Sequence, residues 1–484
     1  MKNLKKVFIA LLLFLGTLTF VGCSTTTENT TQSTTQSTTT TEQQKLATPT
    51  NFTISEKGIA TWDAVEGATQ YRLNFVNNET NVSMKRVSSE NSIDINSLDL
   101  PEATYNIFIQ AIGNNSESDY TAVPVVYEVL PQAVKQVLEG EELIDGLYVK
   151  WLGRNEYNAN KQINMMYHSA SSFEFKAVGS EVTVELYATR TDVETALPYI
   201  VIMVDDNYDA RLRMPLTQEM NTINIGEVMA EKGVTINDDL VHTFSIYKST
   251  ESTDSHIGLK KITTNGELYQ EVVYKERLIE FIAASSSTGY GNLVLGGTKT
   301  SSNSDCMSAF SYLTARALNA DIHIYSASGW AVKQSAWHSA EQNLYNAYKK
   351  IDFNSSKAWD FTKYTPDCIV INLGTNDLSY LQTLSGTLYD QKVAEFKQQY
   401  VDFLNFLYQT YPNVKIVMLY GLMVETDIYT YTEEIYETAK ATIPTLSIIK
   451  FVGDKKGAGS HPSLECHAQI AEALTAKIRQ EMGW

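Results

Sequence analysis

The spacing of apolar residues divides the chain into segments of different structural type. In residues 46–130 and again in residues 131–275, apolar and polar positions alternate in short runs separated by turn-forming residues. Side chains of a β-strand point alternately to its two faces, so this period of two predicts half-buried strands. We therefore predict two all-β sandwich domains, the second of them a sandwich or jelly roll. The clearest runs are Tyr71, Leu73 and Phe75 in the first segment and Val182, Val184 and Leu186 in the second.

The pattern changes in residues 276–484, where continuous apolar runs alternate with longer amphipathic segments. Residues 368–373 are almost entirely apolar, as expected of a parallel strand that is covered on both faces. Residues 392–408 place their apolar side chains on one face of a helix. This alternation of strands and helices predicts an α/β domain with a mostly parallel sheet. Further strands are predicted over 278–283, 322–325 and 414–419, and further helices over 307–318 and 464–482.

The N-terminal 45 residues carry export signals rather than a fold. Three lysines among the first six residues precede an apolar run that is too short to span a membrane comfortably, which is the layout of a signal peptide over residues 1–22. The ending Val21-Gly22-Cys23 resembles a lipobox, so Cys23 is the expected lipid anchor; the alternative is an ordinary signal peptide with a chance cysteine. Residues 23–45 are rich in Thr, Ser and Gln and are expected to be a flexible linker. The protein is therefore expected at the outer face of a bacterial membrane.

The charge of the chain argues against nucleic acid as a partner, and its cysteines argue against disulfides and a metal site. The chain has 38 Lys and Arg against 56 Asp and Glu, a net charge of −18, and no basic cluster beyond its N-terminus, which argues against nucleic acid as a partner. Cys306, Cys368 and Cys466 are odd in number and widely spaced, so we expect buried small side chains rather than disulfides or a metal site. No interface signal stands out, which leaves the oligomeric state open.

Four polar clusters occupy the places where an α/β sheet carries its chemistry. Ser285, Gly329 and Asn376 each follow a predicted strand, and His461 comes just before the last helix. The carboxyl ends of parallel strands lie at one edge of a sheet, so these residues are expected to meet there. A serine hydroxyl reacts only when a base takes its proton, and a histidine is a suitable base at neutral pH. The sequence therefore makes Ser285 and His461 a candidate nucleophile and base.

In this order the four clusters resemble the blocks of the SGNH (GDSL-type) hydrolases. The resemblance implies Ser285 as nucleophile, His461 as base, and no metal or cofactor. It also implies an oxyanion hole formed by the backbone N–H groups of Ser285 and Gly329 and by the side-chain amide of Asn376. Tyr290 and Trp330 are expected to bind substrate, Trp330 together with Trp337 as a flat platform for sugar rings; the alternative for Trp337 is a place in the core.

The similarity is closer to carbohydrate esterase family two, whose jelly roll precedes an SGNH domain. It is carried by segments 151–154, 277–282, 359–361 and 371–377. It implies an acetyl xylan esterase-like enzyme that deacetylates xylan, mannan or related glycans outside the cell. Residues 46–130 resemble a fibronectin type III domain, with Trp62 and Tyr71 on neighbouring strands and Tyr105 in the place of that family's corner tyrosine.

Two departures from the SGNH pattern raise an alternative function. Gly-Asp-Ser is usual at the nucleophile, and this chain has Ala283-Ala284-Ser285. Family members commonly place an Asp two or three residues before the histidine, where this chain has Ala458 and Gly459; Asp454 is a distant candidate. The alternative is therefore a catalytically degenerate esterase that acts as a surface glycan-binding protein. The feature that separates the two is whether Ser285 and His461 approach to hydrogen-bonding distance.

Overall fold

The computed structural model describes residues 45–484 except 56, 99, 115, 130–133, 193–194 and 424–425. The chain divides into two compact units between residues 132 and 133. The predicted signal peptide, the lipid anchor Cys23 and the linker up to residue 44 lie outside the described residues. In the described part of the chain no helix is both long and apolar enough to cross a membrane.

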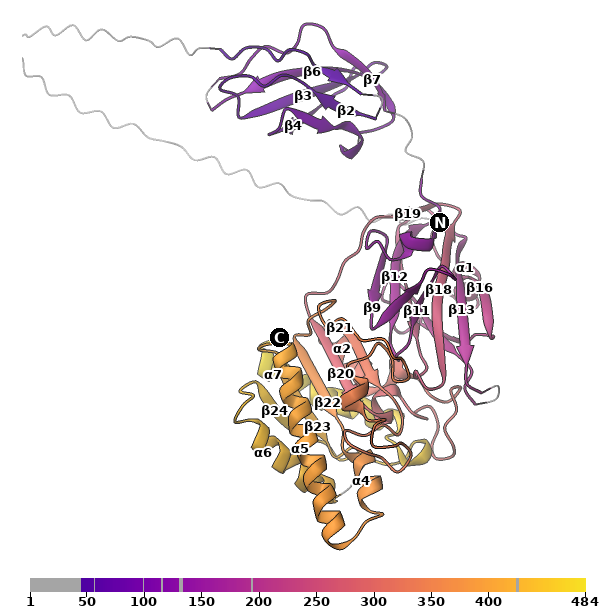
Figure 1. The fold of residues 1–484 in the computed structure, drawn as a ribbon. Coiled ribbons are helices and arrows are strands. Elements are labelled where there is room, and N and C mark those ends of the chain that lie inside the picture. Colours follow the sequence, from indigo (N-terminus) through magenta and orange to yellow (C-terminus); the bar gives the residue numbers. More distant parts are fainter. Residues whose placement is uncertain are drawn as a thin grey trace, which may run out of the picture. The chain divides into compact units, whose positions relative to one another are not determined.

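The first unit is a sandwich of two antiparallel sheets, as the alternating pattern predicts (Figure 1). Tyr71, Leu73 and Phe75 all point into its core, because they occupy every second position of one strand. The hydroxyl of Tyr105 donates a hydrogen bond to the Pro101 carbonyl at 2.8 Å, the kind of corner bond expected of this tyrosine. The likeness to fibronectin type III itself stays a prediction. One sheet has the order β1–β2–β5 (Thr53–Ile54, Ile59–Thr61, Ser92–Asp94), and the other β4–β3–β6–β7 (Ser83–Ser88, Gln70–Asn77, Ala103–Ile112, Val125–Val129).

The second unit begins with another sandwich of two antiparallel sheets, which fulfils the prediction for residues 131–275. Its core includes Val182, Val184 and Leu186 from one strand. A short helix, α1 (Ile225–Ala230), was not expected from the apolar spacing, because six residues are too few to show a helical period. One sheet runs β10–β11–β18–β13–β16 with β8 beside β18 (Asn155–Asn158, Ile163–Met166, Ser255–Thr264, Val182–Arg190, Glu219–Asn224; Val137–Glu139). The other runs β15–β14–β17–β12–β19 with β9 beside β12 (Leu212–Pro215, Tyr199–Val204, His242–Lys248, Ser172–Val178, Glu267–Tyr269; Val149–Leu152).

The same unit continues into an α/β domain built on a five-stranded parallel sheet of order β21–β20–β22–β23–β24. Four of these strands and the helices α2, α5 and α7 match predicted segments. The pattern did not reveal α6 or β24, because tyrosines and threonines in α6 blur its apolar stripe. The strands are β20 (Leu278–Ala283), β21 (Asp321–Ser326), β22 (Cys368–Asn372), β23 (Lys415–Tyr420) and β24 (Leu446–Lys450). The helices are α2 (Phe310–Ala317), α3 (Leu344–Ala347), α4 (Thr375–Leu381), α5 (Gly386–Thr410), α6 (Thr426–Ala439) and α7 (Leu464–Met482).

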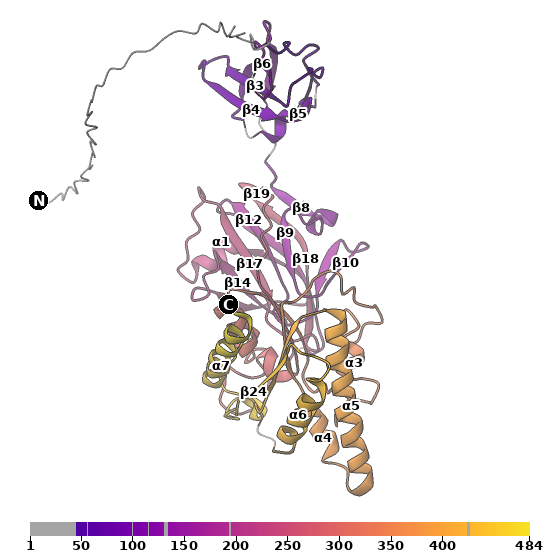
Figure 2. The ribbon, with the colours of Figure 1, turned by 90° about the vertical axis from the view of Figure 1, so that its left-hand side faces the viewer.

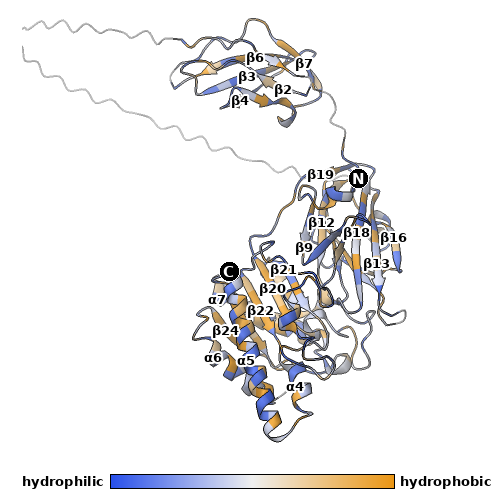
Figure 3. Cartoon of the chain, viewed as in Figure 1, coloured by the Kyte–Doolittle hydropathy of each residue, from blue (hydrophilic) through white to orange (hydrophobic). Residues whose placement is uncertain are grey.

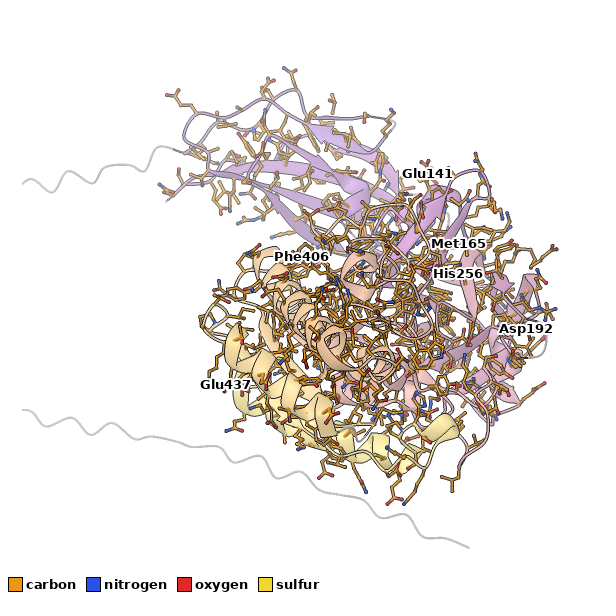
Figure 4. All side chains as sticks on the ribbon, turned by 60° about the horizontal axis from the view of Figure 1, so that its bottom comes forward. Glu141, Met165, Asp192, His256, Phe406 and Glu437 are labelled. Atoms are coloured by element: carbon orange, nitrogen blue, oxygen red, sulfur yellow. The ribbon has the colours of Figure 1, made fainter. Side chains whose placement is uncertain are left out.

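Helices cover both faces of this sheet, which explains the continuous apolar runs of its strands (Figure 2). Ile369 and Ile371 pack with residues of α5 and α6, whereas Val370 between them packs with residues of α2 and α7. Figure 3 shows the resulting contrast between apolar strands and the helix α5, whose outer side is polar. Figure 4 shows how densely side chains fill the layers, with Phe406 of α5 labelled. The strand order changes direction at β20, and its carboxyl end is where such a sheet binds ligands.

Buried ion pairs join the jelly roll to the α/β domain within the second unit. Lys150 and Asp321 form a pair at 2.8 Å with both side chains 5% exposed. The buried guanidinium of Arg154 lies 3.8 Å from a carboxylate oxygen of Glu280 and donates hydrogen bonds at 2.5 Å to the Tyr348 and Lys350 carbonyls. Burying charges costs several kcal/mol unless partners are fixed in place, so these pairs require one defined arrangement of the two domains.

Candidate active site

Two residues 176 positions apart meet at the carboxyl edge of the sheet. Ser285 opens a single 3₁₀ turn, η3 (Ser285–Thr288), directly after β20, and His461 lies in the segment before α7. The Ser285 Oγ is 2.7 Å from His461 Nε2. The structure therefore brings the predicted nucleophile and base to hydrogen-bonding distance.

Backbone carbonyls orient the histidine ring in this chain. His461 Nδ1 lies 3.1 Å from the Ala458 carbonyl and 3.2 Å from the Gly459 carbonyl. A carbonyl can only accept, so Nδ1 must carry the proton, and Nε2 is then the acceptor for the Ser285 hydroxyl. Asp454 does not contact the ring, because its carboxylate accepts hydrogen bonds from the N–H and hydroxyl of Ser463 instead. The pair is a dyad, with carbonyl oxygens where a triad has a carboxylate.

Burial favours the neutral form of His461, the form in which the imidazole can accept a proton. The ring is 9% exposed, and desolvation lowers the pKa of His461 below its ordinary value, while the two carbonyl contacts oppose that shift in part. The half-buried Tyr290 stacks on the imidazole, with ring centroids 4.0 Å apart and an angle of 21° between the planes. The imidazole is therefore unprotonated at neutral pH and held flat against an aromatic ring.

The structure also distinguishes among the three consecutive serines. Ser287 is fully buried, and its Oγ lies 3.1 Å from the Ala284 carbonyl and 2.7 Å from Ser326 Oγ, both within hydrogen-bonding distance. Ser285 alone of the three is hydrogen-bonded to His461. Ala283 is the last residue of β20, and Ala284 has φ −117°, so neither position needs the conformational freedom of glycine. The Ala283-Ala284 departure thus leaves the nucleophile turn intact.

The predicted oxyanion-hole residues line the same cavity as Ser285 and His461. This cavity has a volume of about 520 Å³. Gly329 follows β21 with φ +78°, a left-handed conformation that favours glycine. Asn376, in the first turn of α4, donates one amide hydrogen to the Trp330 carbonyl at 2.8 Å, which fixes the side chain. An amide carries two hydrogens, so a second remains to meet a ligand in the cavity.

Only one of the two tryptophans expected to form the platform lies at the cavity. Trp330 is 4% exposed, and its ring packs in the core against Phe353 and His338. Trp337 is 65% exposed and lines the cavity. A platform for a sugar ring must present an open face, which Trp337 has and Trp330 lacks, so the expectation for Trp330 is corrected. Tyr290 lines the cavity, as expected of a residue that contacts substrate.

Two carboxylates that support the site, Asp377 and Glu251, are not among the site residues predicted from the sequence. Asp377 is fully buried and accepts hydrogen bonds from the backbone N–H groups of Val332 and Lys333 at 3.0 and 2.8 Å, which ties α4 to the loop after Gly329. Burial raises the pKa of Asp377 to about 7, against the opposing effect of these N–H groups. Glu251 of the jelly roll reaches Ser328. The signal for Glu251 was a polar run directly after the buried strand that ends at Lys248.

The described residues contain no group of three or more His, Cys, Asp and Glu side chains that could share a metal ion. Independence from metals and cofactors stays a prediction of the sequence.

Comparison with known proteins places this fold among esterases, although no protein-family model matches the chain. A cellulase/esterase, CelE of Acetivibrio thermocellus, is 28% identical over 257 residues, which are 50% of this chain and 30% of that protein. An acetylxylan esterase / glucomannan deacetylase of Cellvibrio japonicus is 23% identical over 352 residues, 70% of this chain and 90% of its own length. A solved family two carbohydrate esterase from Clostridium thermocellum in complex with cellohexaose has a TM-score of 0.60 at 23% identity, over 69% of this chain and 99% of that structure.

These homologues and structural neighbours are family-two carbohydrate esterases. The chain shares their fold, a set of β domains followed by an SGNH α/β domain. It spans less than a third of the first of these relatives and nine-tenths of the second. The named relatives are carboxylic ester hydrolases, in agreement with the enzyme class that the sequence predicts.

Proposed function

We propose that this protein is an exported serine esterase that removes O-acetyl groups from polysaccharides such as xylan or mannan. The observation that carries the proposal is the hydrogen bond of 2.7 Å between Ser285 and a His461 whose Nδ1 is fixed by two carbonyls. Deacetylation of polysaccharides is the activity that the named relatives suggest. The intact dyad favours an active enzyme over a degenerate glycan-binding protein.

The geometry gives each step of ester cleavage a named group. Ser285 Oγ attacks the acetyl carbonyl while His461 Nε2 takes its proton. The tetrahedral oxyanion is bound by the N–H groups of Ser285 and Gly329 and by the Asn376 amide. His461 then donates the proton to the departing sugar oxygen, which leaves an acetyl-serine. In the second half, His461 deprotonates a water molecule that attacks this ester, and acetate leaves as Ser285 regains its proton.

The shape of the cavity suits an acetyl group carried on a sugar ring. The dyad lies in an open cavity of about 520 Å³, a size that accommodates an acetylated sugar unit. The exposed ring of Trp337 lines this cavity and offers a face on which a sugar ring can stack. The protein's partner is accordingly an acetylated polysaccharide.

The activity is tested by measuring acetate release from acetylated xylan, acetylated glucomannan and an aryl acetate. We expect Ser285→Ala and His461→Ala to lose turnover by roughly 10³-fold or more, as members of a nucleophile–base unit do. Ser287→Ala is the matched control, because its hydroxyl bonds Ser326 rather than His461. Chelator should leave the rate unchanged. If Ser285→Ala releases acetate as fast as the unchanged protein, the proposed mechanism is wrong.

Export and anchoring form a separate part of the proposal. The lipobox-like Val21-Gly22-Cys23 and the Thr/Ser/Gln-rich residues after it support a lipid anchor at Cys23 with the enzyme held outside the cell. Metabolic labelling with a fatty acid tests this directly. The unchanged protein should carry the labelled fatty acid and be found in the membrane fraction, and Cys23→Ala should not be labelled. Equal labelling of both proteins would show that Cys23 is not the acylated residue.

A further inference from the structure

A buried carboxylate of the jelly roll contacts the loop that carries the oxyanion-hole glycine. Glu251 lies in the turn between β17 and β18 and is 3% exposed. Its Oε2 accepts a hydrogen bond from the Ser328 backbone N–H at 2.8 Å, and its Oε1 accepts one from the Ser328 hydroxyl at 2.8 Å. Both carboxylate oxygens therefore hold the residue that directly precedes Gly329.

The turn that carries Glu251 is itself fixed from within the jelly roll. Lys248 is fully buried, and its Nζ donates to the Thr250 carbonyl at 2.5 Å and to the Glu251 carbonyl at 3.1 Å. Burial lowers the pKa of Lys248 to about 8. A buried ammonium that loses its partners is strongly destabilising, so this lysine keeps the turn in one conformation. The Thr250 and Ser255 hydroxyls, 2.7 Å apart, close the turn.

A cation balances the charge of Glu251. Lys299 Nζ lies 2.9 Å from Glu251 Oε1 and also pairs with Asp254. Burial alone would raise the pKa of Glu251, but the Lys299 ammonium and the hydrogen bonds from Ser328 together lower it below its ordinary value. The group is therefore a carboxylate at neutral pH, a form that only accepts hydrogen bonds and offers lone pairs on both oxygens.

An oxyanion hole works only when its donors are held in place before the reaction. Hydrogen bonds to a charged acceptor are stronger than neutral ones, and a carboxylate with two bonds to one residue fixes both its position and its orientation. The Ser328 N–H and hydroxyl are occupied by Glu251, and the next N–H along the chain, that of Gly329, is the predicted oxyanion donor. Because Ser328 is held in place, the peptide bond between Ser328 and Gly329 is fixed in direction, and with it the Gly329 N–H.

We propose that Glu251 is a positioning residue that holds the Ser328–Gly329 peptide so that the Gly329 N–H faces the oxyanion. This inference rests on the proposed function and extends it, because it makes the jelly roll a working part of the esterase site. The β domain supplies no atom to the reaction. It supplies a fixed carboxylate that anchors the loop after β21 at Ser328.

The test compares Glu251→Ala and Glu251→Gln with Asp254→Asn as the matched control. Asp254 lies in the same turn and pairs with the same lysine, but it does not contact Ser328. We expect kcat on an aryl acetate to fall about 10²-fold in Glu251→Ala and about tenfold in Glu251→Gln, which keeps one acceptor oxygen, since a lost oxyanion donor typically costs 10²–10³-fold. KM should stay within about threefold in each variant, because these contacts act on the transition state rather than on the bound ester.

Thermal unfolding of each variant keeps the result interpretable. If Glu251→Ala does not fold, Glu251→Gln carries the comparison, since it preserves the volume and one hydrogen bond. Glu251 variants whose kcat equals that of Asp254→Asn would overturn the proposal. A changed acid limb of the pH–rate profile with an unchanged plateau would also overturn it, because Glu251 would then act on His461 rather than through Gly329.

A second reagent separates this inference from the proposed function. If the unchanged protein releases no acetate, the proposed function fails, and the role of Glu251 is then measured by the rate at which a fluorophosphonate labels Ser285. That reaction also places negative charge on an oxygen in the oxyanion hole. We expect Glu251→Gln to be labelled roughly tenfold more slowly than Asp254→Asn, in keeping with the loss of a positioned donor. Equal labelling rates would overturn the inference.

Discussion

A single methyl group at Gly291 should disable the proposed esterase site without altering Ser285 or His461. Gly291 has φ +56°, and a Cβ placed on it would lie 2.2 Å from the Cβ of Ala458. Two carbon atoms in ordinary contact are about 3.5–4.0 Å apart, so Gly291→Ala must push the segment around Ala458 by more than about 1 Å. Ala458 supplies one of the two carbonyls that hold His461, so this displacement reaches the base.

The magnitude follows from the geometry of the dyad. Moving His461 by about 1 Å lengthens its bond to Ser285 Oγ, now 2.7 Å, beyond hydrogen-bonding distance. Misplacement by this amount typically costs about 10²-fold in rate, which is the expected fall in kcat on an aryl acetate. The alanine also occupies a left-handed conformation, at a cost of about 1–2 kcal/mol in stability.

Gly296→Ala is the matched control for this prediction. Gly296 lies five residues further along the same loop with φ +68°, and nothing stands within 4 Å of a Cβ placed on it. Both variants should lose stability from backbone strain, and Gly291→Ala should lose more because of its clash; the melting temperature measures both, but only Gly291→Ala should lose the large factor in kcat. If the two variants have kcat values within about threefold of each other, the clash does not reach His461, and the reasoning from the Ala458 carbonyl is refuted.

Three further predictions concern pH, substrate and stability. Because burial lowers the pKa of His461, the neutral base persists below pH 6.5. The value of kcat/KM should therefore stay on its plateau through that pH and fall about tenfold per pH unit only below the lowered pKa. An acid limb above pH 6.5 would contradict the assigned burial effect. Trp337→Ala should raise KM for acetylated xylan severalfold and leave an aryl acetate unaffected, since only the polymer uses the platform; equal effects on both substrates would argue against stacking. Asp321→Ala leaves the buried Lys150 unpaired and should lower the free energy of unfolding by about 3–5 kcal/mol in a urea titration. The control Glu142→Ala breaks an exposed ion pair and should lower it by less than about 1 kcal/mol.

Two kinds of sequence pattern predicted the fold and the position of the site, and the family resemblance added the esterase function. Alternating and continuous apolar runs reported whether a strand is covered on one face or on two, which is a local property of burial and therefore visible residue by residue. The polar clusters at strand ends then placed Ser285, Gly329 and Asn376 at one edge of the sheet. The helices α1 and α6 were not predicted, because their apolar stripes are short or blurred. Their stability comes from tertiary packing rather than from a clear helical period.

The sequence alone identified Ser285 and His461 as the candidate nucleophile and base, and the tertiary structure decided what surrounds them. The Ala458 and Gly459 carbonyls that orient the ring are backbone atoms, which carry no residue-specific signal. The exposure of Trp337 and the burial of Trp330 depend on how a loop folds back on the core. Glu251 reaches Ser328 across 77 positions and from another domain. Contacts of this kind leave no periodic trace in the chain, because they are set by the packing of whole elements rather than by the neighbours of a residue.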